Sequence, residues 1–265
     1  MTSPGDPSNS VARRALAAYA ERSPATQADI DRVMRALVEH DDWYVPVLFA
    51  DSGWGQTNFD QMMLFADGAP STLLTVFTDQ ESAVLADGQG IGVYGGPVSG
   101  VQLMRALGGS FNAIIVNPAS PREHQWYIAA GGFRIAGEWA TAIAVERALA
   151  ERGSGPVPAT ELLAHRFQLL LDKESNALAQ VSLPDLDGAV SVCFTAADRA
   201  EEFFASLPPG LRGLAEVTPV EGPQLFSMMR GVGSAGVVVN AGSDDQTLLT
   251  RDDLAELAGL RPAPL

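Results

Sequence analysis

The sequence of 265 residues contains one cysteine, one lysine and three histidines, and each shortage excludes a kind of chemistry. The single Cys193 cannot form an intramolecular disulfide or a cysteine-based zinc site, and its apolar neighbours predict a buried thiol. The single Lys173 lies in a polar stretch typical of an exposed turn, where a Schiff base is not expected. His40, His124 and His165 are far apart in the sequence and belong to no HExxH motif. We therefore expect no catalytic residue, metal site or cofactor, with a histidine site assembled by folding as the alternative and exposed or capping histidines as the simpler interpretation.

Basic residues are also few, with 17 Lys and Arg against 32 Asp and Glu and a formal net charge of -15. Nucleic-acid binding requires an excess of basic residues, so the charge excludes it and favours a basic protein partner. A hydrophobic content of 46% excludes a disordered chain. The sequence has no apolar run long enough to span a membrane, and its first ten residues do not resemble a signal peptide. We therefore expect a soluble cytoplasmic protein without nucleic-acid or membrane partners.

The pattern of apolar residues predicts helices interleaved with short strands. Thr26 and Asp29 have the spacing of a capping box at the start of an amphipathic helix, and a helix is also expected at residues 11–22. Further helices are predicted at 79–86, 99–107, about 138–152 and 250–257, and strands at 43–50, 61–66, 72–77, 91–94, 113–116, 126–129, 166–171, 177–183 and 189–194. This order predicts an α/β or α+β fold, in which helices pack against mixed β-sheets.

Three short motifs occur twice in the same order, at offsets of 117, 122 and 123 residues: Phe77-Thr78 and Phe194-Thr195, Gly100 and Gly222 with the apolar residues that follow them, and Asn117 and Asn240 after apolar strands. Each threonine is predicted to cap a helix. A repeat this long indicates two tandem domains, for which we expect an approximate two-fold relation. The predicted organisation is an N-terminal extension (1–25), a first copy (26–152), a Gly- and Pro-rich linker (153–158) and a divergent second copy (159–265).

The motifs of the first copy resemble the SseB family, named for enhanced serine sensitivity. The resemblance is carried by YVPV at residues 44–47, VFTD at 76–79 and IIVNPAS at 114–120, and it covers roughly residues 33–128. The second copy matches weakly because Ala241 stands where the first copy has Pro118. Membership implies a domain without a known catalytic centre, so it transfers no mechanism.

Three residues are candidates for contact with a protein partner: Trp54, Phe59 and Asn117. Trp54 and Phe59 lie in a Gly-rich polar loop at residues 51–60, where they are partner contacts if exposed and core residues if the loop folds back. Asn117 closes a strand, where its amide can bind its own loop or form part of a binding edge. The GxGxxG match at residues 90–95 follows a predicted helix rather than a strand, so it indicates tight turns rather than a dinucleotide site.

These observations predict a non-enzymatic, cytoplasmic, SseB-like module that binds another protein, as an adaptor or an immunity-like protein. One alternative is an enzyme or small-molecule-binding protein with a site assembled between the two copies, linked to amino-acid metabolism as the family name suggests. Another alternative is a homo-oligomer, in which the partner is a second copy of the chain.

Overall fold

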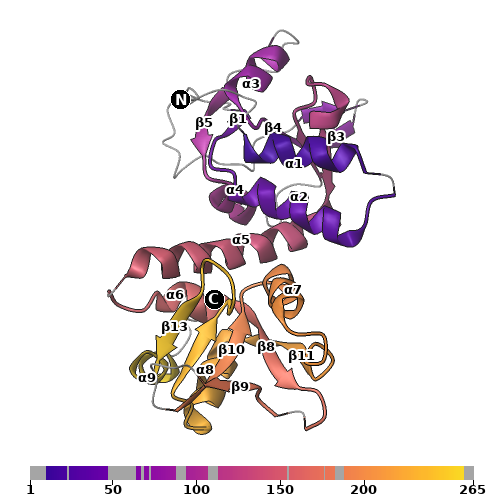
Figure 1. Ribbon diagram of the computed structural model, residues 1–265. Coiled ribbons are helices and arrows are strands. Elements are labelled where there is room, and N and C mark those ends of the chain that lie inside the picture. Colours follow the sequence, from indigo (N-terminus) through magenta and orange to yellow (C-terminus); the bar gives the residue numbers. More distant parts are fainter. Residues whose placement is uncertain are drawn as a thin grey trace, which may run out of the picture. The chain divides into compact units, whose positions relative to one another are not determined.

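The computed structural model describes residues 10–22, 24–46, 64–66, 69–71, 73–87, 94–106, 113–153, 155–175, 177–182 and 188–259. These residues form an α+β fold with mixed sheets, as the sequence predicts (Figure 1). The chain divides into two compact units, Met1–Ala140 (unit 1) and Thr141–Leu265 (unit 2). Among the described helices, none has both the length and the apolar character needed to cross a membrane.

Unit 1 begins with two helices that pack against each other. Its elements are α1 (Val11–Ala20), α2 (Gln27–Glu39), β1 (Trp43–Pro46), β2 (Leu64–Ala66), β3 (Ala69–Ser71), β4 (Leu73–Val76), α3 (Gln80–Asp87), β5 (Tyr94–Val98), α4 (Gly100–Ala106), β6 (Ala113–Val116), the 3₁₀ turn η4 (Arg122–His124) and β7 (Trp126–Ala129). Helix α5 (Ala130–Arg152) follows β7 directly and continues into unit 2.

Most described strands of unit 1 are joined around one parallel pair, while β2 and β3 form a separate antiparallel pair. Strand β4 is parallel to β6, β6 is antiparallel to β7, and β1 is antiparallel to β5. Tyr44 and Phe77 link the two sets through reciprocal backbone hydrogen bonds of 2.9 Å. The order is therefore β5-β1-β4-β6-β7, with the carboxyl ends of β4 and β6 side by side.

The capping box predicted for α2 is present. Asp29 donates its backbone N–H to the Thr26 hydroxyl at 3.3 Å, and its carboxylate accepts the Thr26 backbone N–H at 3.0 Å. The Thr26 hydroxyl also donates to this carboxylate at 2.7 Å, and the two hydrogen bonds from Thr26 lower the pKa of Asp29 to about 2 because they stabilise the ionised form. Helix α1 packs onto the unit through Ala12 and Leu16, which are buried.

Unit 2 contains the same kind of sheet. After the second half of α5 its elements are α6 (Ala159–Ala164), β8 (Arg166–Asp172), β9 (Gln180–Ser182), β10 (Ala189–Phe194), α7 (Ala197–Ser206), β11 (Ala215–Glu221), α8 (Gly222–Gly231), β12 (Gly236–Val239), β13 (Thr247–Thr250) and α9 (Arg251–Gly259). The strand order is β11-β8-β10-β12-β13, in which β10 and β12 are the parallel pair (Figure 1). Val145 and Leu149 of α5 belong to its core, so the division between the units falls within α5, upstream of residues 153–158.

Two predictions of local structure are wrong. Helix α5 begins at Ala130, eight residues before the expected start, because the helix runs through Gly131, Gly132 and Gly137 although glycine disfavours helix. The residue that caps α3 is Asp79, whose Oδ1 accepts the backbone N–H of Ser82 at 2.8 Å.

The predicted threonine caps are therefore one residue too early. Helix α7 likewise begins after Ala196, which makes no side-chain cap, rather than after Thr195. Thr78 and Thr195 instead bind the asparagines that follow the neighbouring strands.

Candidate functional site

Asn117 lies at the carboxyl end of β6, next to the end of the parallel strand β4. Its Oδ1 accepts the backbone N–H of Thr78 at 3.0 Å, and its Nδ2 donates to the Thr78 hydroxyl at 2.9 Å and to the His124 carbonyl at 3.2 Å. Its φ of 50° is left-handed, a conformation that asparagine adopts more readily than most residues. Because its side chain is 0% exposed, Asn117 holds the loop after β6 in place and presents no surface of its own.

Asn240 makes the corresponding contact in unit 2. It follows β12, has a φ of 54°, and its Oδ1 accepts the backbone N–H of Thr195 at 2.9 Å. Its Nδ2 donates to Asp245 at 3.0 Å, within the turn that leads to β13. The recurrence of the asparagine is therefore explained by backbone support in both units.

Two buried histidines contact the backbone carbonyls of the same two threonines. His40 Nε2 lies 2.7 Å from the carbonyl of Thr78, and His165 Nε2 lies 2.8 Å from the carbonyl of Thr195. Burial lowers the pKa of both histidines, that of His165 to about 4, so each ring is neutral and donates its Nε2–H.

The sequence analysis missed this role, because it interpreted the histidines as isolated, exposed or capping residues. The available signal was local. Each histidine ends the helix before the first strand of its unit and comes shortly before a buried aromatic residue, Trp43 or Phe167.

Two glycines complete the shared pattern. The backbone N–H of Gly100 donates to the His40 carbonyl, and that of Gly222 donates to the His165 carbonyl, both at 2.8 Å. A Cβ at Gly100 would lie 2.4 Å from the carbonyl oxygen of Val38, and one at Gly222 would meet backbone at 2.2 Å. Only glycine fits at either position. The tandem duplication stays a prediction, which these matching contacts support.

Each threonine hydroxyl donates to a carboxylate that is paired with an arginine. In unit 1, Thr78 donates to Asp79 at 2.8 Å, and Arg13 of α1 lies 3.5 Å from that carboxylate. In unit 2, Thr195 donates to Glu146 of α5 at 2.5 Å, and Arg199 of α7 lies 3.5 Å from it. In unit 1, α1 therefore supplies the cation of the ion pair, whereas in unit 2 α5 supplies the anion.

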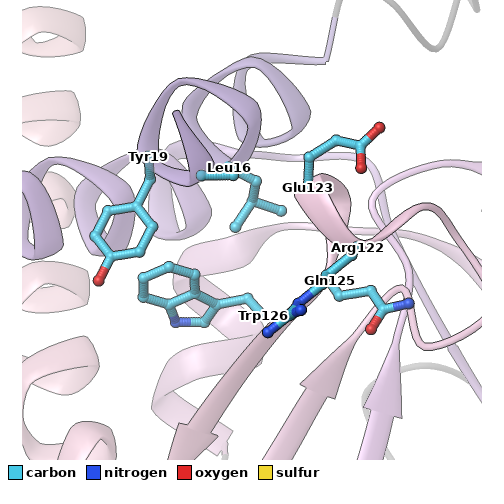
Figure 2. Close-up of a pocket in the computed structure, with 7 residues that line it drawn as sticks. Leu16, Tyr19, Arg122, Glu123, Gln125 and Trp126 are labelled. Atoms are coloured by element: carbon cyan, nitrogen blue, oxygen red, sulfur yellow. The ribbon is translucent and has the colours of Figure 1, made fainter. Parts of the chain in front are cut away.

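A pocket lies beside this cluster in unit 1, between α1 and the segment from η4 to β7. We call it the α1 pocket. It has a volume of about 490 Å³ and is lined by Leu16, Tyr19, Ala20, Arg122, Glu123, Gln125 and Trp126. Figure 2 shows Leu16 and Tyr19 projecting from the helix opposite Trp126, with Arg122, Glu123 and Gln125 along the other side. The rings of Tyr19 and Trp126 meet edge to face, with centroids 4.5 Å apart.

The wall of the α1 pocket is held by its own hydrogen bonds. Gln125 Nε2 donates to the carbonyls of Ser120 at 2.6 Å and Pro118 at 3.2 Å. Asn117 binds the carbonyl of His124, and Arg13 Nη2 lies 3.2 Å from His124 Nδ1. Asn117 therefore acts on the pocket through the loop that it supports. The other predicted contact residues, Trp54 and Phe59, lie outside the described residues.

The remaining candidate reactive groups lie in unreactive surroundings. Cys193 is 0% exposed, as predicted, and burial raises the pKa of its thiol. Over the described ranges, no group of three or more histidine, cysteine, aspartate or glutamate side chains is placed to hold a metal ion.

No family model matches the chain, and no curated protein matches it. Among solved structures, the chain is similar to Anabaena Tic22, described as a protein of protein transport, with 8% sequence identity over 88% of this chain and 99% of that chain, at a TM-score of 0.22. A similarity of this degree carries no argument about fold or function.

Proposed function

We propose that the chain is a non-enzymatic, cytoplasmic, SseB-like module that binds another protein, and that the α1 pocket receives a side chain of that partner. The observation that carries the proposal is the pair of half-buried aromatic rings, Tyr19 and Trp126, at the wall of a pocket with charged residues along its rim.

The residue types of the α1 pocket suit a protein contact. Tyrosine, tryptophan and arginine dominate the binding energy of protein interfaces, because they combine a large apolar area with polar groups. Leu16 forms the buried floor, while Arg122 and Glu123 are exposed and available to a partner's polar groups.

The net charge of -15 favours a basic partner, since opposite charges accelerate association and favour correct pairing. At physiological ionic strength, salt largely screens the attraction between exposed charges that are more than about 8 Å apart. We therefore expect the association rate to fall as salt is raised, while the contribution of the aromatic rings persists.

In our proposal unit 1 binds the partner and unit 2 has a supporting role. In unit 2 the end of α5 is fixed to α9 by a bidentate ion pair, in which Arg152 contacts the Asp253 carboxylate at 2.6 and 3.2 Å. Both side chains are at most 15% exposed, so this contact serves packing within unit 2.

The test is affinity capture from native lysate, followed by titration of the purified partner in a calorimeter. Trp126→Ala should weaken binding about 30-fold or more, the size of an interface hot spot. Tyr127→Ala is the matched control, because successive residues of a strand point to opposite faces and its ring is not part of the pocket. A Trp54→Ala, Phe59→Ala double variant tests the other predicted contact.

A partner that binds the wild type and Trp126→Ala equally would contradict the assignment of the α1 pocket. Retained binding by that variant together with loss in the double variant would move the site to the 51–60 loop. A small molecule that occupies the pocket instead would favour the alternative function, since its volume suits such ligands.

A further inference from the structure

The polar contacts of Arg13 join α1 to two other segments of unit 1. Arg13 Nη2 lies 3.2 Å from His124 Nδ1 on η4, and Nη1 lies 3.5 Å from Asp79 and 3.6 Å from Glu81 at the start of α3. The side chains of Arg13 and Asp79 are 13% and 14% exposed, so their contact is largely shielded from water, whereas Glu81 is 60% exposed. Arg13 thus connects the two walls of the α1 pocket.

The contact with His124 requires one protonation state. A guanidinium can only donate hydrogen bonds, so His124 Nδ1 must accept, and the ring must be neutral with its proton on Nε2. A protonated ring has no acceptor and carries a positive charge. Protonation of His124 would therefore replace an attraction to Arg13 by a repulsion at 3.2 Å.

We propose that His124 is a pH-sensitive latch that holds α1 against η4 when neutral and releases it when protonated, which opens the α1 pocket. The effect on α1 follows from the contacts of Arg13 alone. The effect on partner affinity rests on the proposed function.

The charged groups around His124 determine which side moves. Asp79 and Glu81 hold Arg13 from the side of α3, so the guanidinium stays with these carboxylates when the ring becomes charged. Arg122 and Glu123 are the charged neighbours of His124 on η4, and both are exposed to water, which screens them. The contact that breaks is therefore the one between α1 and η4, and α1 loses the support of η4.

The other two histidines do not share this behaviour. His40 and His165 are buried and have lowered pKa values, that of His165 about 4, so His165 stays neutral between pH 7.5 and 5.5. Their contacts with the carbonyls of Thr78 and Thr195 use a donor nitrogen, which protonation preserves. A substitution at His124 therefore distinguishes an effect of this histidine on α1 from an effect of His40 or His165.

The direction of the effect follows from linkage between protonation and opening, because a proton binds more readily to a ring that has moved away from the Arg13 guanidinium. Acidification therefore favours the open form.

Hydrogen exchange of the α1 amides, corrected for the intrinsic pH dependence of exchange, measures opening directly. In the full wild-type chain, the α1 amides should exchange faster at pH 5.5 than at pH 7.5. His124→Gln keeps an acceptor but cannot be charged, and Arg13→Gln removes the opposing cation, so both variants should lose the pH dependence. His124→Lys, with a permanent charge, should open α1 at pH 7.5.

Equal α1 protection at both pH values in the wild type would overturn the latch, and so would an unchanged pH dependence in His124→Gln. Fluorine NMR of 5-fluorotryptophan at Trp126 gives a second readout in the pocket, assigned with Trp126→Phe. If α1 opens as expected while affinity for the captured partner is constant, the latch stands and the proposed binding site fails.

Discussion

Asn117 and Asn240 adopt the same left-handed backbone conformation, with φ of 50° and 54°, at the ends of the second strand of each parallel pair. Each accepts a backbone hydrogen bond from the threonine that follows the first strand, across 39 residues in unit 1 and 45 residues in unit 2. The same residue type thus provides both the turn and the bond between neighbouring strand ends.

Replacement of Asn117 should separate these two roles. Asn117→Ala removes three hydrogen bonds and places a Cβ residue without polar compensation at positive φ, which should lower the free energy of unfolding by about 3 kcal/mol. Asn117→Gly removes the same bonds without the conformational penalty, so it should be about 1 kcal/mol more stable than the alanine variant. Urea unfolding measures both. Equal stabilities of the two variants would show that the backbone conformation costs nothing.

The backbone of Gly222 lies so close to α6 that the addition of one methyl group should have a severe effect. Gly222→Ala places its Cβ 2.2 Å from the carbonyl oxygen of Leu162, so we expect a loss of more than about 3 kcal/mol or failure to fold. Gly231→Ala, in the same helix α8 but in open space, should be stabilising by about 0.5 to 1 kcal/mol. Thermal unfolding of both variants is the measurement. A Gly222→Ala protein as stable as the wild type would contradict the observed packing.

Burial of His165 makes the stability of unit 2 depend on pH. Its pKa is lowered to about 4 in the folded chain from an ordinary 6.5, so the unfolded chain binds more protons between these values. This contribution to stability is complete above about pH 6.5 and is lost as the pH falls towards 4, by roughly 3 kcal/mol in total. His165→Gln should remove this part of the pH dependence. Urea unfolding at pH 7 and at pH 4.5 gives the change in the free energy of unfolding between the two pH values for the wild type and the variant. An identical change in both proteins would show that His165 is not the responsible group.

The Thr195 hydroxyl should matter more than that of Thr78. Thr195→Val leaves the carboxylate of Glu146, which is 9% exposed, without its shortest hydrogen bond, so we expect a loss of about 2 kcal/mol. Thr78→Val affects Asp79, which is more exposed and also accepts bonds from Ser82. The smaller loss expected for this matched variant is measured by urea unfolding. A larger loss at Thr78 would reverse the ranking and contradict the argument from burial.

The contacts that the sequence predicts best are local ones. The capping box of Thr26 and Asp29 spans three residues, and the same pattern holds at Thr250 and Asp253. Apolar period and turn residues likewise predict most helices and strands, because these depend on neighbours in the chain. Thr78 shows where a local pattern fails. Its backbone N–H and hydroxyl bind Asn117, 39 residues further along the chain, and the threonine does not cap a helix.

The candidate site depends on contacts between distant residues, which no local pattern specifies. Arg13 and His124 are 111 residues apart, and Tyr19 meets Trp126 only after α1 packs on the unit. The sequence analysis placed α1 in an extension and gave it no function. Its charge pattern becomes informative only when the positions of Asp79 and His124 in space are known.

The opposite placement of charge in the two units also makes their helices mutually incompatible. An α1 helix set against unit 2 would bring the guanidinium of Arg13 towards that of Arg199, and the α5 carboxylate of Glu146 set against unit 1 would face Asp79. Each unit thus rejects the other's helix through repulsion between like charges. Charge complementarity thus matches each sheet to the helix of its own unit at this position.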